Sequence, residues 1–369
     1  MAETKYYVGF NLVKGIGGAR LRALLDHFDD LETAWHASPH ELKEAGLDRR
    51  SLENLLTTRA EVSLDEEMEK IERKGARVLT WDDPRYPPNL LNIHNPPPVL
   101  YVKGEILEED QWAVAVVGTR GATVYGKEAA RWIAGDLARN RVTVVSGLAR
   151  GIDSQAHRAA LEAGGRTIAV LGSGIDIVYP PESRRLAEAI VEHGALVTEY
   201  PLGTPPEAGN FPPRNRIISG LALGVVIVEA GERSGALITA DYALEQGREV
   251  FAVPGNVFRK KSRGTNALIQ QGAKLVLSVE DILEELNLTM VSQQAEVRAI
   301  VPENETEAAL LEYITSEPIH VDELSRLSGL PIAQVTGTLA LMELKGVVRQ
   351  VGGMHYVLAR ESRVEYVID

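Results

Sequence analysis

The sequence predicts an α/β protein: an extended Rossmann-like, doubly wound parallel sheet, preceded by a small helical domain and followed by a winged helix. Three observations predict this architecture. Short runs of apolar, β-branched residues alternate with helical stretches between residues 113 and 277. These runs are continuously apolar, which is typical of strands covered on both faces. Helical patterns without strands fill residues 1–75, and a helix–helix–helix–ribbon order fills residues 306–358.

The first predicted domain, residues 1–75, contains a glycine-rich turn at 12–18 that enters an apolar-periodic stretch at 19–25. This pattern predicts a helix-hairpin-helix, whose turn can aim backbone N–H groups at a phosphate. An ordinary helix pair joined by a glycine turn fits the same residues. The sequence leaves both interpretations open.

The second predicted domain spans residues 76–285. It begins with a proline-rich stretch at 84–98, where six prolines fix φ and remove hydrogen-bond donors, so we expect an extended connector there. The alternation of strands and helices that follows predicts a parallel sheet. The expected strands are 113–117, 142–145, 167–171, 195–198, 225–229, 249–253 and 274–277, and helices are expected at 122–139, 154–163, 183–193 and 235–246.

An acidic linker at 286–305 separates the sheet from the third predicted domain, residues 306–369. This domain has the order of a winged helix, with helices expected at 306–315, 321–328 and 332–345 and a ribbon of strands at 347–351 and 354–358.

The third helix of the winged helix is the element that would read DNA, yet it has no Lys or Arg before Lys345. A helix in the major groove needs such side chains as phosphate anchors. We therefore expect this domain to contact protein or only to assist DNA binding. Tight duplex binding by residues 300–369 alone would contradict this expectation.

Composition narrows the class of protein. The 369 residues are 44% hydrophobic and 25% charged, contain no cysteine, and include no run of eighteen apolar residues. The first residues lack the basic and then apolar layout of a signal peptide. We therefore expect a cytoplasmic protein without disulfides, thiolate metal sites or membrane spans.

Charge is unevenly distributed along the chain. The formal net charge is −13, but residues 113–279 hold 19 Lys and Arg against 15 Asp and Glu, a net charge of +4. Residues 280–312 hold 1 against 9, a net charge of −8. The overall acidity therefore does not argue against nucleic-acid binding by the middle of the chain.

The loops after the predicted strands carry glycines, hydroxyl groups and cationic side chains. In an open parallel sheet, ligands bind beyond the carboxyl ends of the strands. Glycine lets backbone N–H groups approach an oxyanion, helix N-termini add a positive dipole end, and arginine offers a bidentate fork. Several such loops side by side would bind the phosphates of a polymer backbone better than those of a single nucleotide. The candidate binding residues are Gly118, Thr119, Arg120, Ser146, Gly147, Arg150, Phe211, Arg214, Asn215, Arg216, Ser234, Gly235, Lys260 and Lys261.

The stretch that begins at Phe211 is the most informative of these loops. Single strands of nucleic acid are held by a cationic groove together with stacking surfaces. We expect Phe211 to stack on a base, the prolines at 212–213 to stiffen the loop, and Arg214 and Arg216 to reach phosphates. A helix is expected to begin after this loop, at residue 217.

Nucleotide cofactors and metals are not expected. No G-x-x-x-x-G-K-[ST] motif occurs, and the segment Gly172-Ser173-Gly174 lacks the third glycine of a dinucleotide fingerprint because residue 177 is isoleucine. Asp153 and His157 stand four residues apart, as metal or acid–base pairs do. Because no third ligand lies nearby in the sequence, we interpret them as structural.

Three acidic residues near strand ends, Asp176, Glu199 and Glu229, are candidates for catalysis. Charged residues are also common at strand ends for structural reasons, and we favour that interpretation. The chain is therefore not expected to be an enzyme.

Five segments together resemble the DNA processing protein A family (DprA, also called Smf). They are residues 118–120, 146–153, 211–221, 234–240 and 253–255. The resemblance covers about residues 80–278, and members of the family often have a sterile-alpha-motif-like domain before this region and a winged helix after it.

The resemblance implies a protein that binds single-stranded DNA without catalysis. Family members typically dimerise through the sheet domain and load the recombinase RecA onto DNA taken up in natural transformation. In some members the single-strand-binding protein is displaced or accommodated in the process. It also implies that Arg120 and the loop 214–216 line the DNA pocket, with the Ser146-Gly147 turn beside them.

One alternative function is enzymatic. The LOG, or lysine-decarboxylase-like, nucleotide phosphoribohydrolases also bind phosphates at strand ends, through a Pro-Gly-Gly-x-Gly-Thr-x-x-Glu segment. Here residues 254–256 and 264–266 depart from that segment, and its glutamate is missing. A scaffold protein without DNA contact is a further alternative.

The DNA-binding hypothesis requires a particular placement of three arginines. Arg120, Arg214 and Arg216 must gather at one rim of the folded sheet, and nearby carboxylates must not neutralise them.

Overall fold

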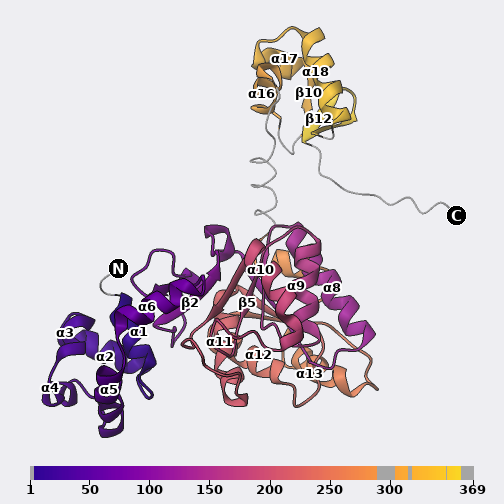
Figure 1. Cartoon of the computed structure of the whole chain (residues 1–369). Coiled ribbons are helices and arrows are strands. Elements are labelled where there is room, and N and C mark those ends of the chain that lie inside the picture. Colours follow the sequence, from indigo (N-terminus) through magenta and orange to yellow (C-terminus); the bar gives the residue numbers. More distant parts are fainter. Residues whose placement is uncertain (1–3, 289–303, 315–317, 346, 359–369) are drawn as a thin grey trace. The chain divides into compact units, whose positions relative to one another are not determined.

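A computed structural model describes residues 4–288, 304–314, 318–345 and 347–358 (Figure 1). The chain divides into two compact units, Met1–Ser292 and Gln293–Asp369. Among the described residues, no helix combines the length and the apolar character needed to cross a bilayer.

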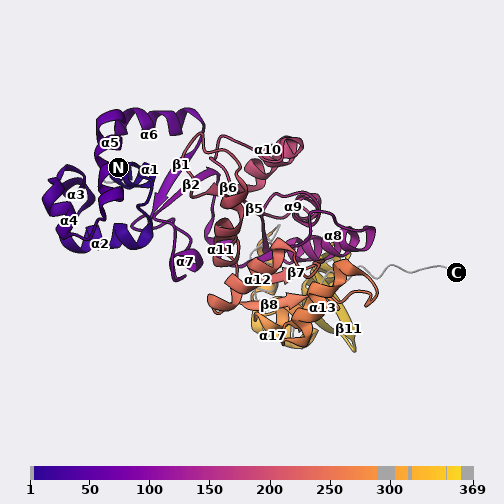
Figure 2. The same cartoon turned by 90° about the horizontal axis from the view of Figure 1, so that it is seen from below.

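The first unit begins with six helices, and side chains cap the starts of four of them. Asp30, Ser38, Asp48 and Ser63 each accept a hydrogen bond from the third residue beyond, which satisfies an otherwise unpaired amide at the helix start. In both views the helices lie beyond the β1 edge of the sheet (Figures 1 and 2). They are α1 (Thr4–Leu12), α2 (Gly18–Phe28), α3 (Leu31–His36), α4 (Pro39–Glu44), α5 (Arg49–Glu61) and α6 (Leu64–Arg73).

The glycine turn predicted at 12–18 joins α1 to α2. Gly15 has a φ of 102°, a left-handed conformation that favours glycine, and Gly17 occupies the N-cap of α2. Tyr7 and Phe10 of α1 are buried in a cluster that also includes Tyr101 of the sheet. The helices and the sheet therefore share one hydrophobic core.

The proline-rich stretch is not the extended connector that the sequence predicted. It contains the short helix α7 (Pro88–Leu91), which begins at a proline because the first helical position needs no hydrogen-bond donor. Tyr86 and Leu90 are buried, and the Tyr86 hydroxyl donates to the Pro97 carbonyl at 2.7 Å. Strands β1 (Arg77–Thr80) and β2 (Val99–Gly104) flank the stretch and pair with each other.

The sheet has nine strands in the order β1-β2-β6-β5-β4-β3-β7-β8-β9. The predicted parallel sheet is confirmed from β6 to β9, while β1 and β2 add an antiparallel edge that the sequence did not predict. Each strand predicted from its apolar run is present. The observed bounds are β3 (Ala113–Val117), β4 (Thr143–Ser146), β5 (Thr167–Val170), β6 (Gly194–Thr198), β7 (Gly224–Ile227), β8 (Glu249–Ala252) and β9 (Lys274–Leu275).

Helices cover both faces of the sheet, as a doubly wound fold requires. One hydrophobic cluster joins the sheet to α8 (Val124–Arg139), α9 (Ile152–Glu162) and α14 (Glu280–Glu285). Another joins it to α11 (Phe211–Leu221), α12 (Gly235–Glu245) and α13 (Arg263–Gln270). Helix α10 (Arg184–His193) contacts β6 and β5.

The strand order reverses at β3. From β3 the chain builds outward through β4, β5 and β6, and then returns to place β7 on the other side of β3. Ligands of open α/β sheets bind in the crevice at such a reversal, outside the carboxyl ends of the strands.

The second unit is a winged helix by its element order. It contains α16 (Glu305–Leu311), β10 (Ile319–His320), α17 (Val321–Ser328), α18 (Ile332–Leu344), β11 (Val348–Gly352) and β12 (His355–Leu358), with the strands in the order β10-β12-β11. α18 carries no basic residue, and Ile332 and Leu341 on it are about half exposed. Most of the predicted acidic linker, residues 289–303, lies outside the described residues.

Candidate nucleic-acid interface

A cleft of about 600 Å³ lies where the strand order reverses, at the carboxyl ends of β3 and β7. Loops that are far apart in the sequence meet in it. Its lining includes eight of the predicted binding residues: Gly118, Thr119, Arg120, Phe211, Arg214, Asn215, Ser234 and Gly235.

Phe211 lies in the cleft but does not belong to a loop. It is the first residue of α11, and the two prolines that follow occupy the first turn of that helix, where their missing N–H groups cost nothing. The prediction that the helix begins at residue 217 is therefore wrong. The Phe211 ring packs on Gly172, where a Cβ would stand only 2.8 Å from the ring, so glycine makes room for this aromatic side chain.

Arg120 and Tyr179 complete a stacking surface around this ring. The Arg120 guanidinium lies 5.1 Å from the centre of the Phe211 ring, and the Arg120 side chain is exposed. The Tyr179 ring lies 5.9 Å from the Phe211 ring at an interplanar angle of 41°, and Tyr179 is 39% exposed. Tyr179 was not among the predicted binding residues, although it follows β5 in a strand-end loop.

Arg214 lies beneath this surface instead of reaching out from it. The residue is only 4% exposed, and its Nη1 donates to the Val170 carbonyl at 2.6 Å. Burial lowers the pKa of Arg214 to about 10, which still leaves the guanidinium charged near neutral pH. The prediction that Arg214 projects from a loop toward a phosphate is therefore wrong, and the residue forms part of the floor of the cleft.

Asp153 faces Arg214 across Gly147, with both charged groups close to this glycine. A Cβ at Gly147 would collide with the Arg214 guanidinium and stand 2.8 Å from Asp153 Oδ2. Burial raises the pKa of the Asp153 carboxyl, while Arg214 and backbone N–H groups, including that of Gly118, act in the opposite direction. Asp153 therefore places a buried carboxyl group against Arg214 beneath the cleft.

His157 is fully buried behind Asp153 on the same helix. Its Nδ1 lies 2.7 Å from Thr167 Oγ1, and the Thr167 hydroxyl in turn donates to the Val144 carbonyl at 2.6 Å. We therefore assign the hydrogen to Nδ1, which leaves Nε2 as an acceptor that has no partner among the described residues. Burial, together with the charge of Arg214, lowers the pKa of His157 to about 3, so the ring is neutral.

Arg216 does not line the cleft. Its Nη2 donates to Glu199 Oε2 at 2.5 Å, and the two side chains are only 14% and 17% exposed. A carboxylate thus neutralises this arginine. The hypothesis required three arginines without carboxylate partners at one rim of the sheet. Arg120 fulfils this requirement and Arg216 does not.

The remaining cationic candidates lie around the cleft. Arg150 is exposed and forms an ion pair with Glu182. Lys261 donates to the carbonyl of Gly121, next to Arg120, and Lys260 is exposed beside it.

The small polar candidates hold the loops in place. The buried Ser146 hydroxyl donates to the Val116 carbonyl at 2.7 Å. Asn215 Nδ2 donates to the Gly235 carbonyl at 3.3 Å and joins α11 to α12. Ser234 caps α12, whose first amides and positive dipole end face the cleft.

Each of the three strand-end carboxylates considered for catalysis forms an ion pair or accepts a hydrogen bond. Glu199 pairs with Arg216, and Asp176 accepts from the backbone N–H of Gly203 at 3.0 Å. Glu229 accepts from both the hydroxyl and the backbone N–H of Thr123, each at 2.8 Å.

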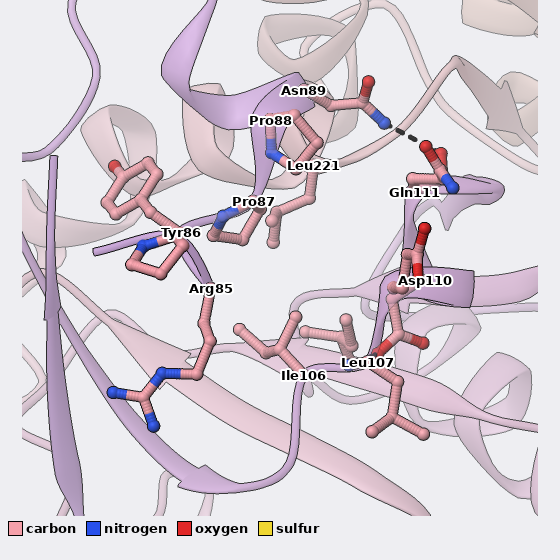
Figure 3. A pocket seen from close by; sticks show the side chains of 13 residues that line it. Arg85, Tyr86, Pro87, Pro88, Asn89, Ile106, Leu107, Asp110, Gln111 and Leu221 are labelled. Atoms are coloured by element: carbon pink, nitrogen blue, oxygen red, sulfur yellow. Dashed lines mark hydrogen bonds between the residues drawn. The ribbon is translucent and has the colours of Figure 1, made fainter. Parts of the chain in front are cut away.

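A second cavity, of about 430 Å³, lies between the proline-rich stretch and residues 106–111 (Figure 3). Polar groups at its rim are already engaged, since Asp110 pairs with Arg166 at 2.8 Å and Asn89 Nδ2 donates to the Gln111 carbonyl at 2.8 Å. None of the predicted binding residues lines it. Its apolar lining includes Pro84, Pro87, Pro88, Ile106, Leu107, Ile168 and Leu221.

Comparison with protein families gives two matches. Residues 77–287 match the model of the family described as DNA recombination-mediator protein A. Residues 294–354 match the DprA winged helix domain. The first match alone covers more than half of the chain.

Individual relatives extend these matches over nearly the whole chain. Protein Smf of Synechocystis is 36% identical over 96% of this chain and 98% of its own length, and Protein Smf of Escherichia coli is 40% identical over 89% and 90%. The crystal structure of DNA processing protein A from Streptococcus pneumoniae superposes with a TM-score of 0.68 and 35% identity, covering 76% of this chain and 98% of that one.

A structure of the Helicobacter pylori DNA processing protein A, described for its single-stranded DNA binding mode, superposes with a TM-score of 0.52. It is 29% identical and covers 57% of this chain and 95% of that one.

Proposed function

Because the chain belongs to the DprA/Smf family of DNA recombination-mediator proteins, we propose that it binds single-stranded DNA without sequence preference at the cleft between β3 and β7. The observation that carries this proposal is the exposed Arg120 guanidinium lying over the Phe211 ring, with Tyr179 beside it. An aromatic face next to an unpaired cation is the combination that holds bases and phosphates of a single strand. The Helicobacter pylori relative, whose structure is described for this kind of binding, supports the same ligand.

The arrangement supports binding to backbone and base faces more than to base edges. Arginine and the positive end of α12 attract any phosphate, and every base has a face that can stack. Such contacts do not distinguish one base from another. Sequence-independent binding follows from them.

We propose that the site performs no catalysis. The engagement of Asp176, Glu199 and Glu229 in structural contacts supports this, and so does the buried position of Asp153 beside Arg214. Release of free base from AMP by the purified protein would favour the phosphoribohydrolase alternative instead.

We further propose that the protein acts as a dimer and delivers its strand to RecA, in DNA recombination that includes natural transformation. The family description as a recombination mediator supports this role. Such delivery would occur on DNA covered by the single-strand-binding protein, which would be displaced or accommodated.

Replacing Phe211 with alanine is expected to weaken binding to a labelled oligonucleotide by about 5- to 150-fold, because stacking contributes about 1–3 kcal/mol per base. Arg120→Ala is expected to weaken binding to all sequences alike and to reduce the log–log salt slope by about 0.7, the value for one phosphate on a single strand. Fluorescence anisotropy across a salt series measures both effects. The same variants should lose stimulation of RecA assembly on covered single strands.

The matched control removes a buried arginine that does not face the cleft. Replacing Arg216 by methionine together with Glu199 by glutamine leaves no unpaired charge, and such replacements are often neutral for stability. We expect the affinity and salt slope of the wild-type protein. Unchanged binding by both Phe211→Ala and Arg120→Ala would remove the cleft as the DNA site.

A further inference from the structure

The loop between β8 and α13 presents an aromatic side chain to solvent. Phe258 is 89% exposed and its neighbour Val257 is 70% exposed. Residues 254–263 also contain Arg259, Lys260, Lys261 and Arg263 and no carboxylate. An exposed ring among four cations is unusual on a soluble surface, where large apolar side chains are normally covered.

The loop is held in shape by its own hydrogen bonds. The Asn256 side chain accepts from the backbone N–H of Phe258 at 2.9 Å, and the Asn256 carbonyl accepts from Arg259 N–H at 2.9 Å. At its base, Asn266 exchanges two hydrogen bonds with the backbone of Gly255, at 3.1 and 3.0 Å. A loop fixed in this way loses little conformational entropy when a ligand binds.

The loop also continues from the cleft. Lys261 donates to the carbonyl of Gly121, the residue after Arg120, and the N–H of Gly264 donates to the Ala230 carbonyl at 2.8 Å, just beyond β7. Arg263 pairs with Glu232 at 3.6 Å. Arg259 and Lys260 form no ion pair or side-chain hydrogen bond within the part of the chain that the structure describes.

We propose that Phe258, with Arg259 and Lys260, is a second stacking contact for the same single strand, so that the DNA path runs from Phe211 across Arg120 to the β8–α13 loop. This inference rests on the proposed function of the cleft. The aromatic ring would take a base and the two unpaired cations would take adjacent phosphates, which is the combination seen at the first contact. The positive charge of the loop complements a polyanion.

The length of the path follows from the sheet. Phe211 packs on Gly172 after β5, and the loop follows β8, which is four strand spacings away along the edge. At about 4.8 Å per spacing the two contacts are roughly 19 Å apart. A stacked strand rises about 3.4 Å per nucleotide, so roughly six nucleotides separate the two rings. An oligonucleotide of four therefore reaches only one ring.

The test compares two lengths of oligothymidylate with the full-length protein. We expect Phe258→Ala to weaken binding of (dT)12 by about 5- to 150-fold and to leave binding of (dT)4 at the cleft unchanged. Phe211→Ala should weaken both. Phe258→Trp should retain the affinity for (dT)12, whereas Phe258→Leu, which is apolar but cannot stack, should behave like the alanine variant.

Trp132→Ala provides a matched control, since Trp132 is an exposed aromatic residue on α8, 44% accessible, and its removal should leave both affinities unchanged. If Phe258→Ala or Phe258→Leu binds (dT)12 as tightly as wild type while Phe211→Ala does not, the second contact is refuted and the cleft stands. If the wild-type protein binds neither length, the proposed function itself fails. A change in sedimentation of Phe258→Ala without a change in DNA affinity would assign the ring to self-association and overturn the inference.

Discussion

Replacing Arg214 with alanine is expected to lower the free energy of unfolding by on the order of 3–5 kcal/mol, the usual cost of leaving a buried charge without a compensating one. The change leaves the buried Asp153 carboxylate without its compensating charge and removes the donor to the Val170 carbonyl. It also empties the space beneath the Phe211 ring, which lies 5.8 Å from the guanidinium. Chemical denaturation of the purified variant measures the loss.

The double variant Arg214→Ala, Asp153→Asn separates the charge from the packing. Because the asparagine carries no charge, we expect the double variant to be more stable than Arg214→Ala alone. If Arg214→Ala instead keeps wild-type stability and loses only DNA affinity, Arg214 is a direct phosphate ligand and its assignment to the cleft floor is wrong.

Lowering the pH from 8 to 5 is expected to cost about 2 kcal/mol of stability through His157 alone. The pKa of His157 is lowered to about 3 by burial, whereas an unfolded histidine titrates near 6.5. Between these values the unfolded chain binds a proton that the folded protein does not, so stability is complete above pH 6.5 and is lost as the pH falls toward 3. In this range the free energy of unfolding falls by up to about 1.4 kcal/mol for each pH unit of acidification.

Denaturation curves of His157→Asn between pH 8 and pH 5 isolate this contribution. The variant should be less stable than wild type at pH 8, but its stability should fall less steeply with acidification. His193→Asn, an exposed change at the end of α10, should reproduce the wild-type slope. Parallel curves for wild type and His157→Asn would mean that the ring is not held neutral in the folded state.

The elements that the sequence predicted are those with a local signal. Strands such as β3, with five consecutive buried apolar residues, could be predicted because both faces are covered. β1 and β2 were missed because β2 joins the sheet by pairing with β6, about a hundred residues along the chain, and β1 joins it only through β2, so no local pattern records either strand. The helix α7 was missed because its prolines suggested an extended chain, while the burial of Leu90 that stabilises it is a tertiary effect.

The sequence predicted the kinds of residues in the candidate site, and the structure corrected where several of them lie. Arg120 was placed correctly in the cleft because it directly follows β3, and strand ends of a parallel sheet meet at one edge. Tyr179 was missed because its approach to Phe211 joins residues 32 positions apart, through two different loops. Only the folded chain brings these rings together.

By itself, the sequence determined the class of fold, the edge of the sheet where the candidate binding residues gather, and the chemistry of cations, glycines and an aromatic ring that suits a polyanion. The tertiary structure decided which arginines are free to act. Residues 214 and 216 lie in α11, where each residue turns about 100° around the axis, so the two side chains point to nearly opposite sides. One side faces Asp153 beneath the cleft and the other faces Glu199. Burial against those carboxylates leaves Arg120 as the exposed cation among the described residues that line the cleft.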